Sequence, residues 1–210
     1  KFEFKGNGSS KGVKNGGKIS IKGGGHAALL GGYVSNSGIV TAKLGKIAIG
    51  SGERITLDFA GDGLMSVTVP SNQIGRITDV DGNTLQSLIN NTGFLKANGG
   101  FIKLSAATAK QLSRGAVNLG RGGAIIARSA NSKPGKVVIG SPSNNKVRLA
   151  GRIDVSGIKS TSPSGTVIVK GRRVKHLGQI YASGASGGKV RMQANQRLEI
   201  NGAILAKGKK

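Results

Sequence analysis

The chain has 210 residues and a formal net charge of +24, because 32 lysines and arginines stand against 8 aspartates and glutamates. It contains 37 glycines, 4 prolines and no cysteine. This composition excludes a disulfide scaffold, a zinc site with cysteine ligands, a collagen-like repeat and a Pro-rich linker. No stretch approaches the roughly 18 consecutive apolar residues of a membrane helix. Many glycines beside β-branched residues predict short strands and tight turns.

Short alternating segments, separated by glycine or asparagine, follow one another through the first half of the chain. In such segments every second side chain faces inward, and Gly and Asn supply the left-handed backbone of sharp corners. No signal peptide precedes the first segment. If the protein is exported, we therefore expect this sequence to be a processed or excerpted piece of it. The segments lie at 1–6, 34–42, 45–50, 89–97, 100–104 and 117–127.

The segment Ser105–Arg114 departs from this alternation. It is rich in alanine, and its apolar residues recur at helical spacing. The segment predicts a single helical turn or a short helix that leaves the run of strands, as a cap or a lateral decoration.

The last third of the chain contains the clearest internal repeat. Residues 165–171 are echoed by 188–194 at an offset of 23, and 174–184 are echoed by 198–208 at an offset of 24. Residues such as Val167 alternate inward, while residues such as Lys189 alternate outward. Earlier copies lie at 135–140 and 147–157, and 158–164 form an inserted loop.

A unit of about 23 residues is too small to bury its own apolar side, whereas stacked units pair strands about 4.8 Å apart and bury it. An antiparallel sandwich would not impose this fixed repeat. The sequence therefore predicts an all-β fold, a right-handed parallel β-helix (β-solenoid) over residues 1–210, with one short helical excursion near 105–114.

The first 130 residues resemble the filamentous haemagglutinin family, the large exoproteins of two-partner secretion. The resemblance implies a chain that passes through an outer-membrane transporter and folds outside as a β-helix; members are adhesins, toxin stalks or surface fibres. It divides the chain into haemagglutinin-like coils at 1–130 and regular repeat coils at 131–210. The family's N-terminal secretion motif is missing, so we expect the chain to begin within that domain's last coils. The resemblance depends on residues 4–8, 32–45, 52–69 and 91–100.

Acidic residues suggest one weak metal site. Asp79, Asp81 and Asn83 are similar to the start of a calcium loop, but no glutamate follows at the required spacing, which favours a β-turn. Glycoside hydrolysis needs two carboxylates across a groove. Asp58 and Asp62 belong to the phrase that resembles the family, so we do not expect them to form such a pair.

The two histidines, His26 and His176, have no neighbouring pattern of a catalytic triad or a metal site. We expect both at solvated or edge positions. The sequence thus predicts no enzyme, no catalytic residue and no cofactor.

Basic residues are the most unusual feature of the chain. Residues 133–210 carry 16 lysines and arginines against 2 acids. The repeat places Lys136 and Lys189 in equivalent positions, and likewise Arg148 and Lys175. Like charges on neighbouring strands repel unless counterions or an anionic partner compensate them. Two explanations are consistent with this charge: a surface that only keeps the protein soluble, and a face that binds polyanions. The candidate polyanion-binding residues are Lys136, Arg148, Arg152, Lys170, Arg172, Arg173, Lys175, Lys189 and Arg191.

These observations predict a secreted structural or adhesive protein of the bacterial cell surface or extracellular matrix. Unpaired strand edges at both ends of a rod predict end-to-end stacking into a filament. Predicted ligands are acidic polysaccharide, lipopolysaccharide, extracellular DNA or a host glycosaminoglycan, although scarce aromatic residues speak against nucleic-acid specificity. The alternatives are a spacer or stalk of a large adhesin or toxin-delivery exoprotein and, less favoured, a polysaccharide-active enzyme.

Overall fold

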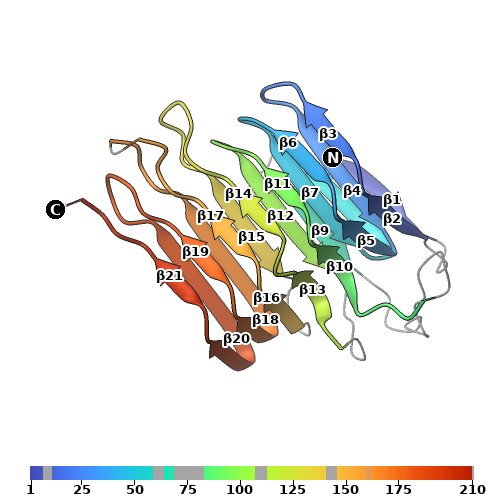
Figure 1. Cartoon of the computed structure of the whole chain (residues 1–210). Helices are drawn as coiled ribbons and strands as arrows, with labels where there is room; N and C mark the ends of the chain where they lie inside the picture. The colour runs from blue at the N-terminus through green and yellow to red at the C-terminus, as the bar shows by residue number, and fades with distance from the viewer. Residues whose placement is uncertain are drawn as a thin grey trace.

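The structure of the chain is a computed structural model that describes residues 1–6, 11–58, 64–68, 83–106, 113–140, 146–159 and 161–209. These residues form strands, turns and loops, and no helix is found among them. The strands assemble into an eleven-stranded, a seven-stranded and a three-stranded sheet (Figure 1). The molecule is therefore all-β.

The eleven-stranded sheet consists of two arms of parallel strands that meet at its C-terminal end. The first arm contains β2 (Gly12–Asn15), β5 (Tyr33–Asn36), β10 (Ser87–Asn91), β13 (Gly115–Leu119) and β16 (Lys146–Leu149). The second arm contains β4 (His26–Gly31), β7 (Lys46–Ser51), β12 (Phe101–Ala106) and β15 (Lys136–Gly140). The long strand β18 (Thr166–His176) pairs with β15 through its first half and with β16 through its second, and β20 (Lys189–Ile200) follows the same path. Because β18 joins the arms, the sheet turns back on itself and nearly closes.

The seven-stranded sheet is also entirely parallel. Its first five strands each follow a strand of the first arm along the chain, and its last two follow β18 and β20. Its members are β3 (Lys18–Ile21), β6 (Ile39–Ala42), β11 (Phe94–Lys96), β14 (Ala124–Ile126), β17 (Arg152–Asp154), β19 (Gln179–Tyr181) and β21 (Ala203–Leu205).

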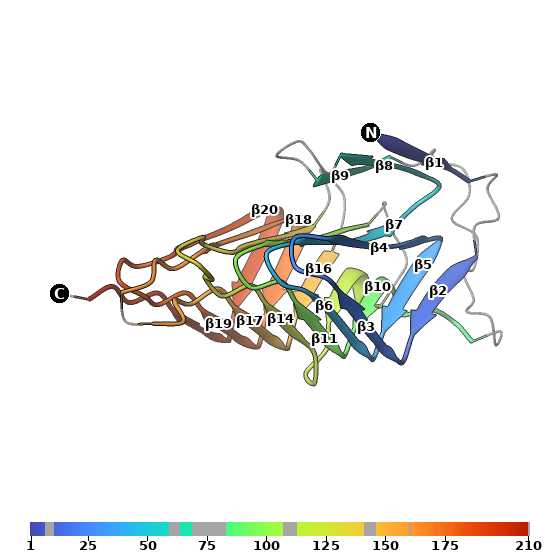
Figure 2. The same cartoon turned by 90° about the horizontal axis from the view of Figure 1, so that it is seen from above.

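The three-stranded sheet is antiparallel and consists of β1 (Phe2–Lys5), β8 (Arg54–Asp58) and β9 (Leu64–Thr68). It lies outside the second arm, next to β7 (Figure 2). A Cβ atom on Gly50 would lie 2.7 Å from the sulfur of Met65, and the ammonium group of Lys103 donates a hydrogen bond to the carbonyl of Met65. These contacts attach the small sheet to β7 and β12.

The interior is filled by the inward side chains of the two parallel sheets. In the seven-stranded sheet, Leu95 pairs with Val40 on one side and with Ile125 on the other, and all three side chains are fully buried. The same alternation places Val167 and Val169 of β18 inside. Each parallel strand thus adds one or two apolar side chains to a continuous row in the core.

Glycine is required where the chain turns from one sheet into the other. Gly178 follows β18, and a Cβ atom there would lie 2.0 Å from the carbonyl oxygen of Gly151 in the preceding turn. A Cβ atom on Gly202 would similarly lie 2.2 Å from the carbonyl oxygen of Gly178. The turns pack directly on one another through their backbones, and this close approach explains much of the glycine content.

The prediction of a right-handed parallel β-helix was wrong, while its all-β class is confirmed. The strands form parallel sheets, the largest of which nearly closes on itself, together with an antiparallel sheet that the repeat did not predict. The physical reason lies in β18. The repeat predicted separate short strands divided by a corner, but a register shift between Gly171 and Arg173 lets one strand continue through the bend.

The prediction of a helical excursion near 105–114 was also wrong for the described residues of that segment. Ser105 and Ala106 continue β12 and pair with Gly50 and Ser51 of β7, so backbone pairing overrides the helical spacing. Residues 107–112 lie outside the described part of the chain. The division at residue 130 stays a prediction. Among the described residues no helix is long and apolar enough to cross a membrane.

Candidate functional site

A groove of about 240 Å³ lies on the outward face of β16, β18 and β20. We call it the basic groove. One acid, Glu199, also lines it. The cationic side chains that line it are Arg114, Lys146, Arg148, Arg173, Lys175 and Arg197.

Two rows of side chains build the basic groove because parallel strands align equivalent residues. Lys146 of β16 pairs with Arg173 of β18, which pairs with Arg197 of β20. The adjacent residues Val147 and Val174 are buried. Alternation therefore directs the basic residues outward, with about 4.8 Å between successive strands.

The second row combines cations with the one acid. Arg148 pairs with Lys175, and Lys175 pairs with Glu199, whose carboxylate lies 2.7 Å from the Lys175 ammonium nitrogen. The hydrogen bond from Lys175 is the main cause that lowers the pKa of Glu199 below its ordinary value. Glu199 thus remains an anion that neutralises part of the groove's charge.

Polar neighbours hold two of the arginines in place. Arg148 donates from Nη1 to Oδ1 of Asn118 at 3.1 Å, and Arg173 donates from Nε to Oε1 of Gln196 at 2.7 Å. Each guanidinium retains further N–H donors, because it carries five in total. The groove therefore presents oriented donors for carboxylate, sulfate or phosphate groups.

The structure divides the nine predicted polyanion-binding residues among different surfaces. Only Arg148, Arg173 and Lys175 line the basic groove. Lys136 of β15 and Lys189 of β20 both pair with Thr166 of β18, which confirms their predicted equivalence in register. Lys170 and Arg191 lie on the same part of the sheet, in β18 and β20.

Three of the basic side chains have specific local environments. The ammonium nitrogen of Lys136 lies 4.9 Å from the ring centroid of Phe101. Arg172 lies at the register shift of β18, and its buried Nε has no hydrogen-bond partner in the described structure. Arg152 belongs to the seven-stranded sheet, where its guanidinium lies over the ring of Tyr181. These three side chains do not join the basic groove.

Asp154 is buried on the outward side of β17 by basic side chains. Its Oδ2 lies 2.7 Å from Nη2 of Arg128 and 2.6 Å from Nη2 of Arg152, and its Oδ1 accepts a hydrogen bond from the Ser156 hydroxyl at 2.6 Å. Burial by itself raises the pKa of Asp154. The hydrogen bonds from Arg128, Ser156 and Arg152 outweigh this effect and lower the pKa to about 2. This cluster stabilises the fold and pairs one Nη of the Arg152 guanidinium with Asp154.

Three residues of the basic groove were not predicted from the sequence: Arg114, Lys146 and Arg197. Arg197 carried a usable signal, because the repeat offset of 24 places it opposite Arg173. Arg114 carried none, since it precedes β13 outside the repeated phrases. Residues far apart in sequence meet here only because the strands pair.

The other candidate residues have different outcomes. His26 is exposed, as expected. The expectation for His176 was wrong, because its side chain is fully buried and its Nε2 lies 3.3 Å from the carbonyl oxygen of Ala203. Asp79 and Asp81 lie outside the described residues. Over the described part of the chain, no three His, Cys, Asp or Glu side chains gather into a metal-binding group.

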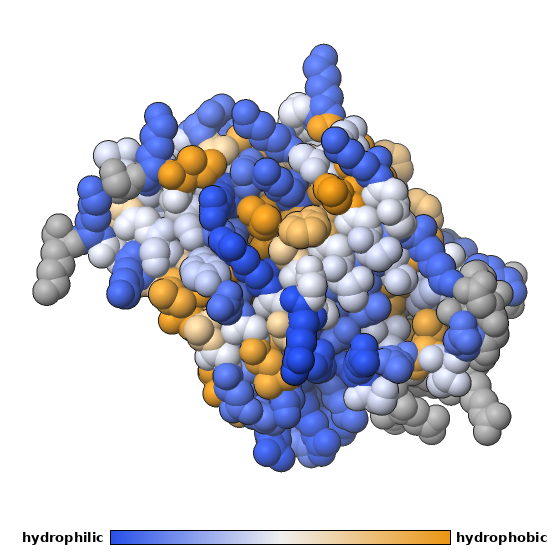
Figure 3. All heavy atoms as spheres, in the orientation of Figure 1, coloured by the Kyte–Doolittle hydropathy of each residue, from blue (hydrophilic) through white to orange (hydrophobic). Residues whose placement is uncertain are grey.

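The visible face of the molecule is mainly hydrophilic, with separate hydrophobic groups among the polar atoms (Figure 3). Two exposed hydrophobic residues, Ile39 and Phe94, are direct neighbours in the seven-stranded sheet. At the C-terminal strands, Leu198 is 44% exposed and Ile200 is 47% exposed. Among the described residues, exposed apolar side chains therefore occur at the C-terminal strands as well as on the seven-stranded sheet and on β1, where Phe2 and Phe4 lie.

The fold is similar to that of the HMW1 secretion domain from Haemophilus influenzae. The TM-score is 0.66 at 21% sequence identity, and the match covers 96% of this chain and 52% of that one. This chain therefore spans about half the length of the chain that it matches, and the likeness establishes the fold alone. No protein-family profile matches the sequence. No curated protein matches it either.

Proposed function

We propose that this chain is a segment of a secreted exoprotein that binds polyanions through the basic groove. The observation that carries the proposal is the row Lys146, Arg173 and Arg197 on three neighbouring strands. Like charges about 4.8 Å apart repel, and an anionic partner along the row turns this repulsion into attraction. Acidic polysaccharide, lipopolysaccharide and extracellular DNA all present anions at repeated intervals.

Several observations support secretion. The fold is shared with a protein domain whose name describes secretion, and phrases such as residues 52–69 resemble the filamentous haemagglutinin family. The absence of cysteine fits a chain that crosses an outer membrane unfolded. We propose export through an outer-membrane transporter and a place on the bacterial surface or in the extracellular matrix, with the segment acting as part of an adhesin or of a stalk.

Heparin chromatography tests the groove. Neutralising cations releases counterions, so retention should fall steeply with salt. The double variant R173Q/R197Q should lose affinity on the order of tenfold, and the slope of log affinity against log salt should fall by about 1.5. The matched control K18Q/K96Q removes the same charge from the seven-stranded sheet. Equal losses in both variants, or retention insensitive to salt, would overturn the proposal.

The proposed role is binding without catalysis. The described residues of the basic groove supply cations and one acid that is paired with Lys175, so they offer no second carboxylate for glycoside hydrolysis. Incubation of the protein with acidic polysaccharides should release no oligosaccharide. Released products that disappear in the variant R173Q/R197Q would show that the groove is catalytic.

Self-association by end-to-end stacking is a second proposed function, and the exposed apolar end favours it. Leu198, Ile200 and Ile204 pair in register with the buried Val174, His176 and Ile180 of the preceding layer. Their own exposures are 44%, 47% and 38%.

The opposite end offers a matching surface. The inward side chains of β2, β3 and β4 include Val13, Ile19 and Leu29, which are only partly buried. In the described structure, β20 and β21 pair on one side only, as do β2, β3 and β4. A second copy would bury both apolar surfaces and supply the missing strand neighbours.

Sedimentation velocity at physiological salt tests the stacking. The wild-type protein should form concentration-dependent oligomers, and Ile204→Lys should abolish them. Ile39→Lys is the matched control, because Ile39 is 41% exposed on the side of the molecule. A wild-type protein that remains monomeric at all concentrations would exclude self-stacking.

A further inference from the structure

A row of outward polar side chains crosses six strands of the first arm and its continuation. Register relates each member to the next, and five strand spacings of about 4.8 Å give the row a length of about 24 Å. The row is Lys14, Ser35, Asn90, Asn118, Arg148 and Lys175. It connects the basic groove with the N-terminal half of the same face.

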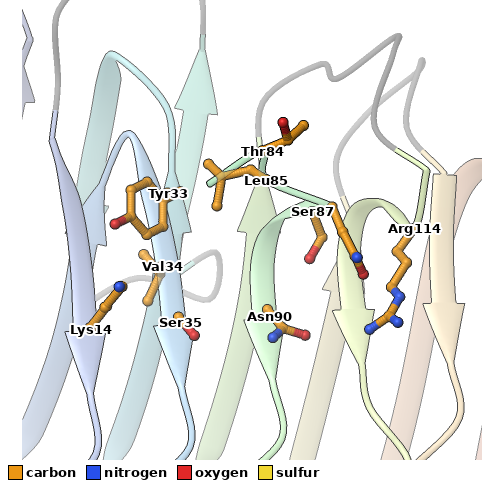
Figure 4. A pocket seen from close by; sticks show the side chains of 10 residues that line it. Lys14, Tyr33, Val34, Ser35, Thr84, Leu85, Ser87, Asn90 and Arg114 are labelled. Carbon is orange, nitrogen blue, oxygen red and sulfur yellow. The ribbon is translucent and has the colours of Figure 1, made fainter. Parts of the chain in front are cut away.

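A second hollow, of about 200 Å³, lies on that N-terminal half. We call it the amide hollow. Ser35 and Asn90 lie side by side on β5 and β10, with Lys14 beyond them on β2 (Figure 4). Gln86 also lines the hollow. Hydroxyl and amide groups both donate and accept hydrogen bonds, which suits an uncharged polar ligand group.

Arg114 connects the two hollows. Its exposed side chain lines both the amide hollow and the basic groove. Its backbone N–H donates to the carbonyl oxygen of Gln86 at 2.9 Å, which fixes its position beside the amide hollow. Asn118 is fully buried between Asn90 and Arg148, with hydrogen bonds of 2.8 and 3.1 Å to them. A ligand that occupies both hollows must therefore pass Arg114.

We propose that the amide hollow, Arg114 and the basic groove form one extended site for an acidic polysaccharide. Neutral hydroxyl-bearing sugar units occupy the amide hollow, and carboxylate or sulfate groups occupy the basic groove. This inference rests on the proposed polyanion binding and specifies the class of ligand. The site thus places uncharged donors and acceptors such as Ser35 and Asn90 beside a block of cations, and an acidic polysaccharide carries groups for both.

The same residues disfavour nucleic acid and polyphosphate as the ligand of the whole site. A uniformly charged polymer gains little from uncharged side chains such as Ser35 and Gln86. Single-stranded nucleic acid binds by stacking of bases on exposed aromatic rings. Tyr33, which lines the amide hollow, is only 4% exposed, and aromatic residues are 3% of the chain.

Binding of hyaluronan, inorganic polyphosphate and single-stranded DNA to the same set of variants tests the inference. The variant S35A/Q86A removes two polar groups of the amide hollow. Each lost hydrogen bond is worth about 1 kcal/mol, so the loss of two should weaken hyaluronan binding about 30-fold. Polyphosphate and DNA binding should not change. Arg114→Gln should weaken binding of hyaluronan and polyphosphate alike.

The matched control is S20A/Q179A, which removes the same groups from exposed positions of the seven-stranded sheet. If S35A/Q86A does not fold, Gln86→Ala alone, at an exposed position, retains a test with about a fivefold loss. Unchanged hyaluronan binding in the variants, or an equal loss of DNA binding, would overturn the extended site and leave the polyanion proposal standing. A wild-type protein that binds none of the three probes would overturn both.

Discussion

Asn36 and Asn91 are joined by a hydrogen bond inside the protein, although 55 positions separate them in the sequence. Nδ2 of Asn36 donates to Oδ1 of Asn91 at 2.6 Å, and Nδ2 of Asn15 donates to Oδ1 of Asn36 at 2.7 Å. Nδ2 of Asn91 donates in turn to the carbonyl oxygen of Gly93 at 3.0 Å. This ladder of amides follows β2, β5 and β10 and fixes their register where the chain turns into the seven-stranded sheet.

Replacing Asn91 with alanine should destabilise the protein. The change removes the acceptor of the Asn36 amide, and a buried donor without a good partner costs about 2 kcal/mol. Urea unfolding followed by circular dichroism should show this loss in the free energy of unfolding. Asn201→Ala is the control, because Asn201 is exposed and its side-chain amide donates to Glu199 at the surface. A loss of equal size in both variants would contradict a special role of the buried ladder.

Asp154 should make stability depend on pH in the acid range. Its pKa is about 2 in the folded protein, against an ordinary value of 3.8. A lowered pKa means that the folded state favours the carboxylate, so this stabilisation is present above about pH 4 and is lost as the pH falls toward 2. The shift corresponds to about 2 kcal/mol.

The variant Asp154→Asn tests this pH dependence. It should lose about 2 kcal/mol at pH 7, and the part of the acid dependence between pH 4 and 2 that belongs to Asp154 should disappear. Free energies of unfolding from urea titrations at several pH values measure both effects. Glu199→Gln, which changes an exposed ion pair, should leave stability nearly unchanged. A wild-type acid dependence retained in Asp154→Asn would show that other carboxylates cause it.

The strand pairing of the last third could be predicted from the sequence. The repeat offsets of 23 and 24 are the pairing offsets of the structure, since Val167 pairs with Val190 and Val174 pairs with Leu198. Apolar alternation fixes this register, because a shift by one residue would turn every inward side chain outward. For the same reason, Arg148 and Lys175 were correctly assigned to equivalent positions.

Other features depend on contacts that leave no local pattern. Phe2 pairs with Leu57 in the antiparallel sheet, and neither segment indicates its partner by sequence. The continuation of β18 through the bend depends on the register shift after Gly171, which lies inside an apparently ordinary repeat. Arg114 lies at the basic groove only because the segment that leads into β13 runs beside β16. Periodicity predicts which face a residue lies on, whereas the composition of a site also depends on how the connecting segments are placed.

Gly178→Ala should destabilise the protein strongly. The new Cβ atom would lie 2.0 Å from the carbonyl oxygen of Gly151, and neither backbone can move without shifting its strands. We expect a loss of about 3 kcal/mol or more in the free energy of unfolding. Gly122→Ala is the matched control, because its nearest atom, the carbonyl oxygen of Thr92, would lie at 3.5 Å. Thermal unfolding of both variants distinguishes them, and similar melting temperatures would contradict the backbone packing of these turns.

Glu199→Gln should strengthen polyanion binding, because Glu199 is the acid that lines the basic groove. The change keeps the shape of the side chain and releases the Lys175 ammonium group, 2.7 Å away, from its ion pair. We expect heparin affinity to rise about threefold at low salt, since electrostatic contributions in an exposed groove are modest and screened. Glu3→Gln is the control, because it makes the same charge change on β1, where Glu3 lies near Lys5 and Arg54.

The pH dependence of heparin binding provides a second readout of Glu199. Its pKa lies below the ordinary value of 4.5, so the carboxylate remains charged in the wild-type protein at neutral pH. Wild-type affinity for heparin should therefore rise as the pH falls below 4.5, because protonation removes the negative charge beside Lys175. Glu199→Gln should lack this rise, since its amide does not titrate. Chromatography at constant ionic strength from pH 7 to pH 3 measures the difference. An identical rise in both proteins would place the binding surface away from β20 and β18.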